Sequence, residues 1–490
     1  MSGIELTLQS ILNPDNTVRK EAESSLEGQK DADPSKLMQD LYGAMSNPDD
    51  NLSNLACVLF KKYFLDLQTV SDETLQMLEQ SIFSILNFER SELVLHAQGS
   101  VIVRIYVKLK EIKTLLSKII DLNNHENFSV RELAMYMLEI LVDVHLPQDL
   151  AKENTDDFVQ LFRRGLEDSE LKVKIACLKA TSSFITSLDD SEVALKFAEL
   201  MDIILAILIE ALKSDEDAGK GALESLVDMA DFHPDIFKNY GSSLIDVVSQ
   251  IMMNTEFEDS TRSSSKEVVI SLATKAPGMV RKFENVKEQF YPALFAMMAE
   301  VDEEDDLKEW NEQEEEDEVT RADTHGVSRD GLVRFARVMG EQVTIDASLT
   351  LIKENIAADD WKRRQAGFFF LGYISESCKG IFLKNLSEIM QMAASGVVDQ
   401  HPRVQYAGLT CLGLLLTELA PKAQKMFHSD IVPKLLDIMN SDSLMKIKTQ
   451  ACSATVNFVR ELIQVDENGI ETTKKENSAI DSYTDEVLET

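Results

Sequence analysis

Two short segments, DDWKRRQA at residues 359–366 and HPRVQYA at residues 401–407, share one order of residues. Each begins with a polar turn, continues through a basic residue and ends at an alanine. The polar turn starts a helix, and the alanine about one turn later lets that helix pack closely against its neighbours. The pattern therefore indicates a repeated helical hairpin in which the turn opens the second helix.

The same pattern recurs along the whole chain. Clear copies are NPDNTVRKEA ending at Ala22, ENFSVRELA ending at Ala134 and DSELKVKIA ending at Ala176. Weaker copies centre on Ala56, Ala97, Ala222, Ser265 and Ala451. The spacing is about 35 to 46 residues, which is typical of HEAT and armadillo arrays. One gap near 100 residues, from Ser265 to Ala366, has room for two units, one of them enlarged.

These repeats predict an all-α fold, a right-handed superhelical solenoid of about ten or eleven HEAT hairpins with almost no strand. First helices are expected on the convex side and second helices on the concave side. The composition agrees, because only 19 Gly and 10 Pro interrupt 490 residues. We expect residues 1–145, 146–300 and 331–466 to form N-terminal, middle and later repeats.

No part of the sequence predicts membrane insertion, secretion or catalysis. The most apolar stretch, LMDIILAILIEAL at residues 200–212, contains Asp202 and Glu210 and is too short to span a bilayer. The N-terminus has no basic segment before an apolar one, so we expect an intracellular protein. No Gly-rich phosphate loop, GxSxG motif or paired Cys/His site is present, which argues against an enzyme and against a cofactor.

The cysteines and histidines do not form a recognisable metal site. Five Cys are far apart and mostly lie among Ala and Leu, and seven His are scattered without an HxxxH pair. We expect no metal site, and we interpret the Cys as small core residues.

Acidity is the extreme feature of the composition. The formal net charge is −36, with a pI near 4.6. Such a charge repels phosphate backbones, so it disfavours nucleic acid and favours basic partners. An alternative interpretation is that the charge serves only solubility.

An acidic insertion interrupts the eighth repeat. The run DEEDDLKEWNEQEEEDE, residues 302–318, follows an apolar helix ending near FAMMAEV, and a helix resumes at GLVRFARVMG. Its charge predicts a solvated, mobile loop within residues 301–330. Leu307 and Trp310 lie in the run, and such residues contribute most to binding where a partner covers them. The alternative is an inert linker.

Several segments resemble the importin-β (karyopherin-β) superfamily. LQSILNPDNTVRKEAESSLE at 8–27 and ACVLFKKYF at 56–64 look like its opening repeats. Residues 360–378, 399–421 and 426–439, which include DWKRRQAGFFFLGYISESC and MFHSDIVPKLLDIM, are similar to the branch containing importin five and karyopherin beta three. Members are about twice this long, so the resemblance implies an N-terminal fragment. ENSAIDSYTDEVLET, within residues 467–490, would begin a further repeat.

The resemblance implies a nuclear transport receptor that shuttles between cytoplasm and nucleus. It would bind basic, Lys-containing localisation signals, contact Phe-Gly nucleoporins through grooves between first helices, and release cargo on binding Ran in its GTP form. The implied Ran contacts are Arg19, Glu23, Lys61 and Lys62 in the first repeats and Asp305, Asp306, Glu309, Glu314, Glu315 and Glu316 in the insertion. Arg19 and Glu23 could equally be helix-surface residues that pair locally.

The same resemblance implies a cargo site at Glu376, Glu418 and Asn457. A carboxylate accepts the three donors of a Lys ammonium, and an Asn amide binds the backbone of an extended peptide. The alternative is that these residues only solvate helix ends or satisfy a neighbouring carbonyl. A HEAT scaffold of another assembly would share the fold, and a catalytic domain outside these residues would not be visible here.

Overall fold

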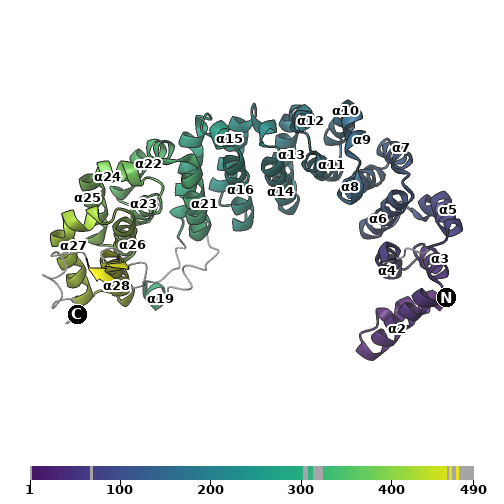
Figure 1. Ribbon diagram of the computed structural model, residues 1–490, viewed down its shortest axis with the longest axis horizontal. Helices are drawn as coiled ribbons and strands as arrows, with labels where there is room; N and C mark the ends of the chain where they lie inside the picture. Colours follow the sequence, from purple (N-terminus) through teal and green to yellow (C-terminus); the bar gives the residue numbers. More distant parts are fainter. Residues whose placement is uncertain are drawn as a thin grey trace. The chain divides into compact units, whose positions relative to one another are not determined.

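The computed structural model describes residues 3–66, 70–301, 307–312, 324–460, 463–465 and 471–473. The chain separates into two compact units, residues 1–236 and 237–490. Figure 1 shows helices throughout both units. None of the described helices is both long enough and apolar enough to cross a membrane.

The first unit consists of six helical hairpins, each a first helix packed against a second helix. Their helices are α1 (Gly3–Ile11) with α2 (Asn16–Ala32), α3 (Pro34–Ala44) with α4 (Asp50–Asp66), α5 (Asp72–Ser81) with α6 (Glu92–Leu109), α7 (Ile112–Asn123) with α8 (Phe128–His145), α10 (Thr155–Leu166) with α11 (Leu171–Ser187), and α13 (Met201–Ser214) with α14 (Glu216–Phe232). Short helices η1 (Ile82–Ile85), α9 (Gln148–Glu153), α12 (Ser191–Leu195) and η2 (Lys196–Leu200) join them, and η3 (Pro234–Phe237) follows α14.

The second unit adds five hairpins of the same kind. They are α15 (Gly241–Met253) with α16 (Asp259–Lys275), α18 (Tyr291–Met298) with α21 (Thr324–Met339), α22 (Glu341–Ile356) with α23 (Trp361–Tyr373), α25 (Leu386–Val397) with α26 (Pro402–Glu418), and α27 (Lys422–Asn440) with α28 (Met445–Arg460). Short elements are α17 (Pro277–Val280), η4 (Val286–Phe290), α19 (Leu307–Glu312) and α24 (Lys379–Lys384). Strands β1 (Ile463–Val465) and β2 (Glu471–Thr473) pair antiparallel.

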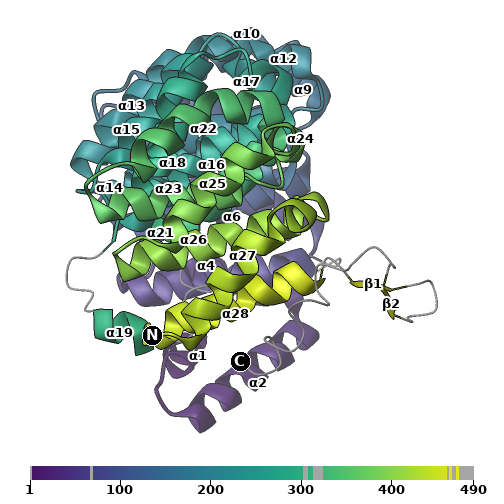
Figure 2. The same cartoon turned by 90° about the vertical axis from the view of Figure 1, so that its left-hand side faces the viewer.

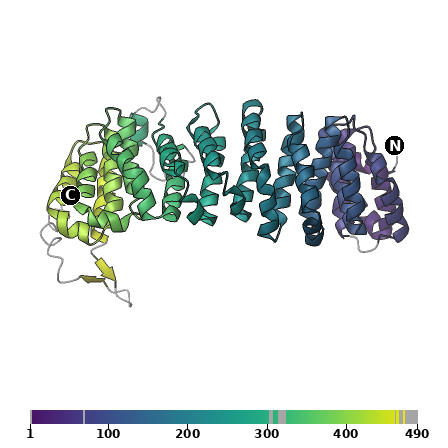
Figure 3. The same ribbon diagram turned by 90° about the horizontal axis from the view of Figure 1, so that it is seen from above.

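Second helices form a continuous row within each unit. In the first unit α4, α6, α8, α11 and α14 each contact the next, and in the second unit α16, α21, α23, α26 and α28 do the same. Figure 3 shows the helices from above, one behind the next along each unit. The described residues therefore form eleven hairpins, which confirms the predicted helical-repeat fold and its number of units.

The small residues of the sequence pattern all lie in the packed interfaces. The ten positions that define the repeat are each less than 9% exposed: Ala22, Ala56, Ala97, Ala134, Ala176, Ala222, Ser265, Ala366, Ala407 and Ala451. Small residues are needed at these positions because the helices approach one another closely. The closest approach is at Gly408 of α26, where an added Cβ would lie 2.4 Å from the carbonyl carbon of Gly396 on α25. Any larger residue at that crossing would push the two helices apart.

The long gap in the repeat pattern contains the second helix α21. It begins at Thr324, seven residues before the GLVRFARVMG segment where the helix was expected. Gly331 occupies the close approach to α16, since a Cβ there would lie 2.6 Å from Lys266 Cδ. Glycine therefore takes the place of the alanine that defines the other repeats.

The arginines of the repeat pattern tie consecutive hairpins together. Arg131 at the start of α8 donates to both carboxylate oxygens of Asp168, at 2.7 and 2.8 Å, and to the carbonyls of His125 and Glu126. Arg364 of α23 binds Asp399 in the same way, at 2.9 and 3.0 Å. Burial raises the pKa of these aspartates, but the arginine hydrogen bonds, a backbone N–H donor and the arginine charge together outweigh it and leave the pKa of each lowered. We call this set of paired Arg and Asp side chains the arginine ladder.

Removing a ladder arginine is expected to destabilise the second unit. Arg364→Met leaves Asp399, whose side chain is 15% exposed, without its charged donor and should cost about 1–3 kcal/mol of unfolding free energy. Because the pKa of Asp399 is lowered in the folded protein, this stabilisation is present above about pH 4 and is lost as the pH falls further. Urea titrations of parent and variant at pH 7 and at low pH measure the difference.

The control is Arg163→Met, which breaks the more exposed pair of Arg163 with Glu199. It should cost less than about 1 kcal/mol. Equal losses for the two variants, or a loss at Arg364 that does not change with pH, would contradict the role given to the ladder.

Candidate functional site

The N-terminal residues expected to contact Ran lie on neighbouring second helices. Arg19 is on α2, where its Nη2 donates to Asn16 Oδ1 at 3.1 Å, and Glu23 is exposed one turn further along. The structure therefore places Arg19 in a local contact within its own helix and leaves the carboxylate of Glu23 on the surface.

The two lysines of the same predicted set lie on α4. Lys62 is exposed, its Nζ is 3.7 Å from Glu27 Oε1 on α2, and it lies over the ring of Tyr63. Lys61 is half-buried, and this burial lowers its pKa; Cys57 opposes the shift, whereas the charge of Arg104 adds to it. The pair thus consists of one lysine available at the surface and one directed partly into the hairpin contact.

Most of the acidic insertion lies outside the described residues. This holds for Asp305, Asp306, Glu314, Glu315 and Glu316. Glu309 is described, and it is exposed on the short helix α19. The part of the insertion that the structure describes is thus helical, where the sequence predicts a loop.

Trp310 of α19 is covered by this chain itself. Only 5% of it is exposed, and its ring meets Tyr406 of α26 edge-on, with centroids 5.5 Å apart. Its carbonyl accepts a hydrogen bond from Lys446 Nζ of α28 at 3.1 Å. Figure 2 shows α19 beside the beginning of α28. Trp310 is therefore covered by its own chain, whereas Leu307 is 38% exposed.

The three residues expected to bind cargo lie at the C-terminal ends of successive second helices. Glu418 is the last residue of α26, and Asn457 lies near the end of α28. Asn457 packs against α26: its Nδ2 is 3.2 Å from the position that a Cβ would occupy at Gly413. Glu376 lies in the turn three residues beyond the end of α23.

Glu376 has a cationic partner that the sequence reasoning missed. Arg337 of α21 donates to both of its oxygens, at 3.2 and 2.9 Å, and both side chains are more than half exposed. The two residues are 39 positions apart, which is one repeat. Pairs at this spacing join neighbouring hairpins throughout the chain, so the spacing itself was the available signal.

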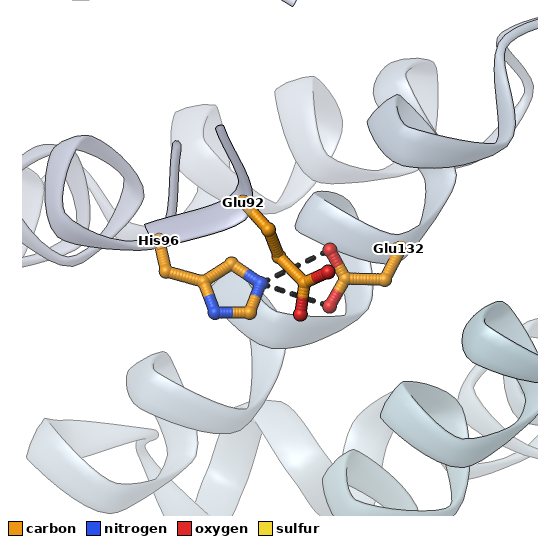
Figure 4. A group of neighbouring side chains, drawn as sticks. All are labelled: Glu92, His96 and Glu132. Atoms are coloured by element: carbon orange, nitrogen blue, oxygen red, sulfur yellow. Dashed lines mark hydrogen bonds and ion pairs between the residues drawn. The ribbon is translucent and has the colours of Figure 1, made fainter. Parts of the chain in front are cut away.

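One group among the described residues could hold a metal ion. Glu92 and His96 of α6 and Glu132 of α8 have ligand atoms within 4.8 Å of one another (Figure 4). His96 Nε2 lies 2.9 and 3.0 Å from the two oxygens of Glu132, and Glu92 pairs with Lys172 at 2.9 Å. These protein contacts satisfy all three side chains, so the group is explained as an ion-pair cluster.

The thiols are mostly inert. Cys57, Cys177, Cys378 and Cys411 are buried, and burial raises the pKa of the first three to about 12. Their interpretation as core residues is confirmed. Cys452 is exposed, so that interpretation was wrong for this residue. It lies beside the buried Ala451 on α28, and neighbouring positions on a helix face different directions.

Comparison with known proteins finds similarity to importins. A family model described as IPO5-like, TPR repeats matches residues 100–247, and one described as Importin repeat matches residues 254–346. Importin subunit beta-3 of Saccharomyces cerevisiae is 24% identical over 474 residues, covering 92% of this chain and 42% of that protein. A probable importin-5 homolog of Dictyostelium discoideum is 25% identical over 350 residues, covering 68% of this chain and 31% of that protein.

The chain resembles the importin-β superfamily over most of its length. Its fold matches that of a solved protein: a crystal structure of Kap121p superposes with a TM-score of 0.87 at 23% identity, covering 99% of this chain and 46% of Kap121p. The chain thus spans less than half the length of these relatives.

Proposed function

We propose that this importin chain acts as a nuclear transport receptor that binds basic localisation signals and releases them when Ran-GTP binds. The observation that carries the proposal is the agreement of two importin family models and two curated importins over most of the chain. Such a receptor works by binding, without catalysis or cofactor, in the cytoplasm and the nucleus. Its net charge of −36 suits basic cargo and disfavours nucleic acid.

A Ran-binding role is supported by a crystal structure of Kap121p bound to RanGTP, which matches this chain with a TM-score of 0.85. We assign the contact to Arg19, Glu23 and the two lysines of α4, with Glu309 and the other acidic residues of the insertion as a second contact. Carboxylates in such numbers attract basic patches of a partner and speed its association.

Deleting residues 302–318 is expected to weaken capture of Ran, because it removes the acidic second contact. The measurement is a pull-down of Ran loaded with GTP or GDP by the parent chain and by the deletion variant. Selective capture of the GTP form by the parent supports a transport receptor, whereas equal or absent capture supports a scaffold. Unchanged capture by the deletion variant would restrict the Ran contact to the first repeats.

Cargo binding is assigned to the C-terminal ends of α23, α26 and α28. Crystal structures of Kap121p bound to Pho4p and to Ste12p show that a similar fold binds other proteins. In this chain Glu376 and Glu418 supply carboxylates for lysine, and Asn457 supplies an amide for the peptide backbone. Arg337 holds Glu376 before cargo arrives, and a lysine of the cargo would displace this exposed partner.

The variants Glu376→Ala, Glu418→Ala and Asn457→Ala, made singly and together, should weaken binding of a short Lys-containing peptide. Each loss should cost about 1–3 kcal/mol, since it leaves a buried donor of the peptide without an acceptor. Arg337→Ala is the matched control and should not weaken binding, because it frees Glu376. Fluorescence anisotropy measures the affinities. A triple variant that binds as tightly as the parent would exclude this surface.

Phe-Gly nucleoporin binding is assigned to a groove between the first helices α25 and α27. A pocket of about 160 Å³ opens there between apolar side chains, among them Met390, Val397, Phe427 and Ile431. A Phe side chain of a nucleoporin fits such an apolar, partly open pocket. A crystal structure of Kap121p bound to Nup53p shows nucleoporin binding by a similar fold.

Filling this pocket should reduce retention on an immobilised Phe-Gly repeat domain. Ala394→Trp places an indole among the lining residues and should lower the fraction retained, while Ser395→Trp on the exposed neighbouring position should not. Equal retention of both variants and the parent would show that Phe-Gly repeats do not use the pocket.

A further inference from the structure

The N-terminal ends of α23, α26 and α28 form a site that holds one segment of the same chain, the helix α19. Trp310 of α19 is only 5% exposed there. We call the site the Trp310 seat, and its side chains, each within the first five residues of its helix, are Trp361, Lys362, Arg403, Tyr406 and Lys446. The seat thus buries an indole that comes from a segment outside the row of second helices.

Two buried cations lie at the centre of the seat. Arg403 and Lys446 are each 4% exposed. The guanidinium of Arg403 lies 5.4 Å from the ring centroid of Trp310 and 5.7 Å from that of Trp361. Lys446 Nζ lies 5.2 Å from the ring of Trp310 and 5.9 Å from that of Tyr406. Aromatic faces attract cations, and this attraction grows when water is excluded.

These cations do not serve the stability of their own helices. The N-terminal end of a helix carries a partial positive charge, so an acidic side chain is favoured there and a basic one is not. Arg403 and Lys446 are nevertheless the second residues of α26 and α28, and Lys362 is the second residue of α23. Three cations at three such ends favour an electron-rich or acidic ligand.

Two hydrogen bonds show what else the seat recognises. Lys446 Nζ donates to the carbonyl of Trp310, and the backbone N–H of Lys446 donates to Asn311 Oδ1, both at 3.1 Å. The first N–H groups of a helix have no partner within it, so Asn311 caps α28 from another segment. Glu309 and Glu312, on either side of this pair, stay exposed. The bound segment is thus a Trp followed by an amide side chain, with acidic neighbours.

We propose that the Trp310 seat is a docking site for a short acidic segment of a partner protein that carries a tryptophan, and that α19 occupies it as an intramolecular competitor. Charge complementarity favours this partner, because the seat gathers three cations on a chain whose net charge of −36 repels acidic segments elsewhere. The residues assigned to cargo lie at the opposite ends of these helices, and the proposal does not depend on their role.

The tether of α19 determines how strongly it competes. Residues 302–306 join α19 to Val301, whose carbonyl accepts from Lys362 Nζ at 2.9 Å. A segment on a short linker reaches an effective concentration of about 1 mM. A partner segment that binds the vacated seat with a Kd of about 100 μM would therefore bind the parent chain about tenfold more weakly.

The test uses a fluorescein-labelled peptide that copies residues 302–318, DEEDDLKEWNEQEEEDE. Fluorescence anisotropy measures its affinity for the parent chain and for two chains with a vacated seat, Trp310→Ala and a deletion of residues 302–318. Both vacated chains should bind the peptide about tenfold more tightly than the parent does. A peptide with Trp310→Ala keeps the net charge and should bind none of the three chains.

Substitutions in the seat separate docking from general charge attraction. In the Trp310→Ala chain, Arg403→Met or Lys446→Met should weaken peptide binding about threefold to tenfold, because each removes a cation that contacts the indole. Lys448→Met is the matched control, since it removes a cation two positions further along α28, on a different side of the helix, and should leave the affinity unchanged.

Three results would overturn the proposal. Failure of the vacated chains to bind the peptide rules out a docking site, and equal affinity of parent and vacated chains rules out competition by α19. A dimer of the parent that Trp310→Ala abolishes would assign the seat to a second copy of this chain. If circular dichroism shows that the vacated chains do not fold, the parent decides: at millimolar concentration it should bind the peptide and not its Trp310→Ala form, and equal binding or none overturns the proposal.

Discussion

Close approach of packed helices, within a hairpin and between neighbouring hairpins, is the constraint on which the structure depends. A hairpin cannot bury its apolar face alone, so each one needs the next, and the helices must come near enough to exclude water. The crossing of Gly396 with Gly408 and the buried alanines of the repeat pattern satisfy this need. The surface facing away from the first helices is then built from the same positions of every hairpin, repeated at a regular interval.

Ion pairs also join consecutive hairpins. Many ion pairs among the described residues join a cation to an acid about one repeat away, as Arg131 does with Asp168 and Arg337 with Glu376. The partly buried pairs hold adjacent turns in place, whereas the exposed pairs contribute little and exchange partners easily. Partly buried pairs are therefore suited to stabilising the fold. Exposed pairs are suited to a surface where a basic ligand competes for the acidic side chain.

The described helix of the acidic insertion has both buried and exposed contacts. Its one described helix is fixed by an indole, two buried cations and two hydrogen bonds, and yet its carboxylates remain at the surface. An acidic segment that carries a tryptophan can thus be anchored at one point while its charge stays available. The contacts of Trp310 with Tyr406 of α26 and Lys446 of α28 explain how the chain positions this helix.

The sequence by itself determined the helical-repeat fold, the number of hairpins and the core positions, because these depend on a local pattern that each repeat carries in full. It also indicated the importin family through motifs at 8–27, 56–64 and 360–439. Only the tertiary structure decided that Gly331 takes the place of an alanine, that Trp310 is buried by its own chain, that Cys452 is exposed and that Arg337 holds Glu376. Each of these depends on which residues from different hairpins face one another, and a pattern within one repeat does not contain that information.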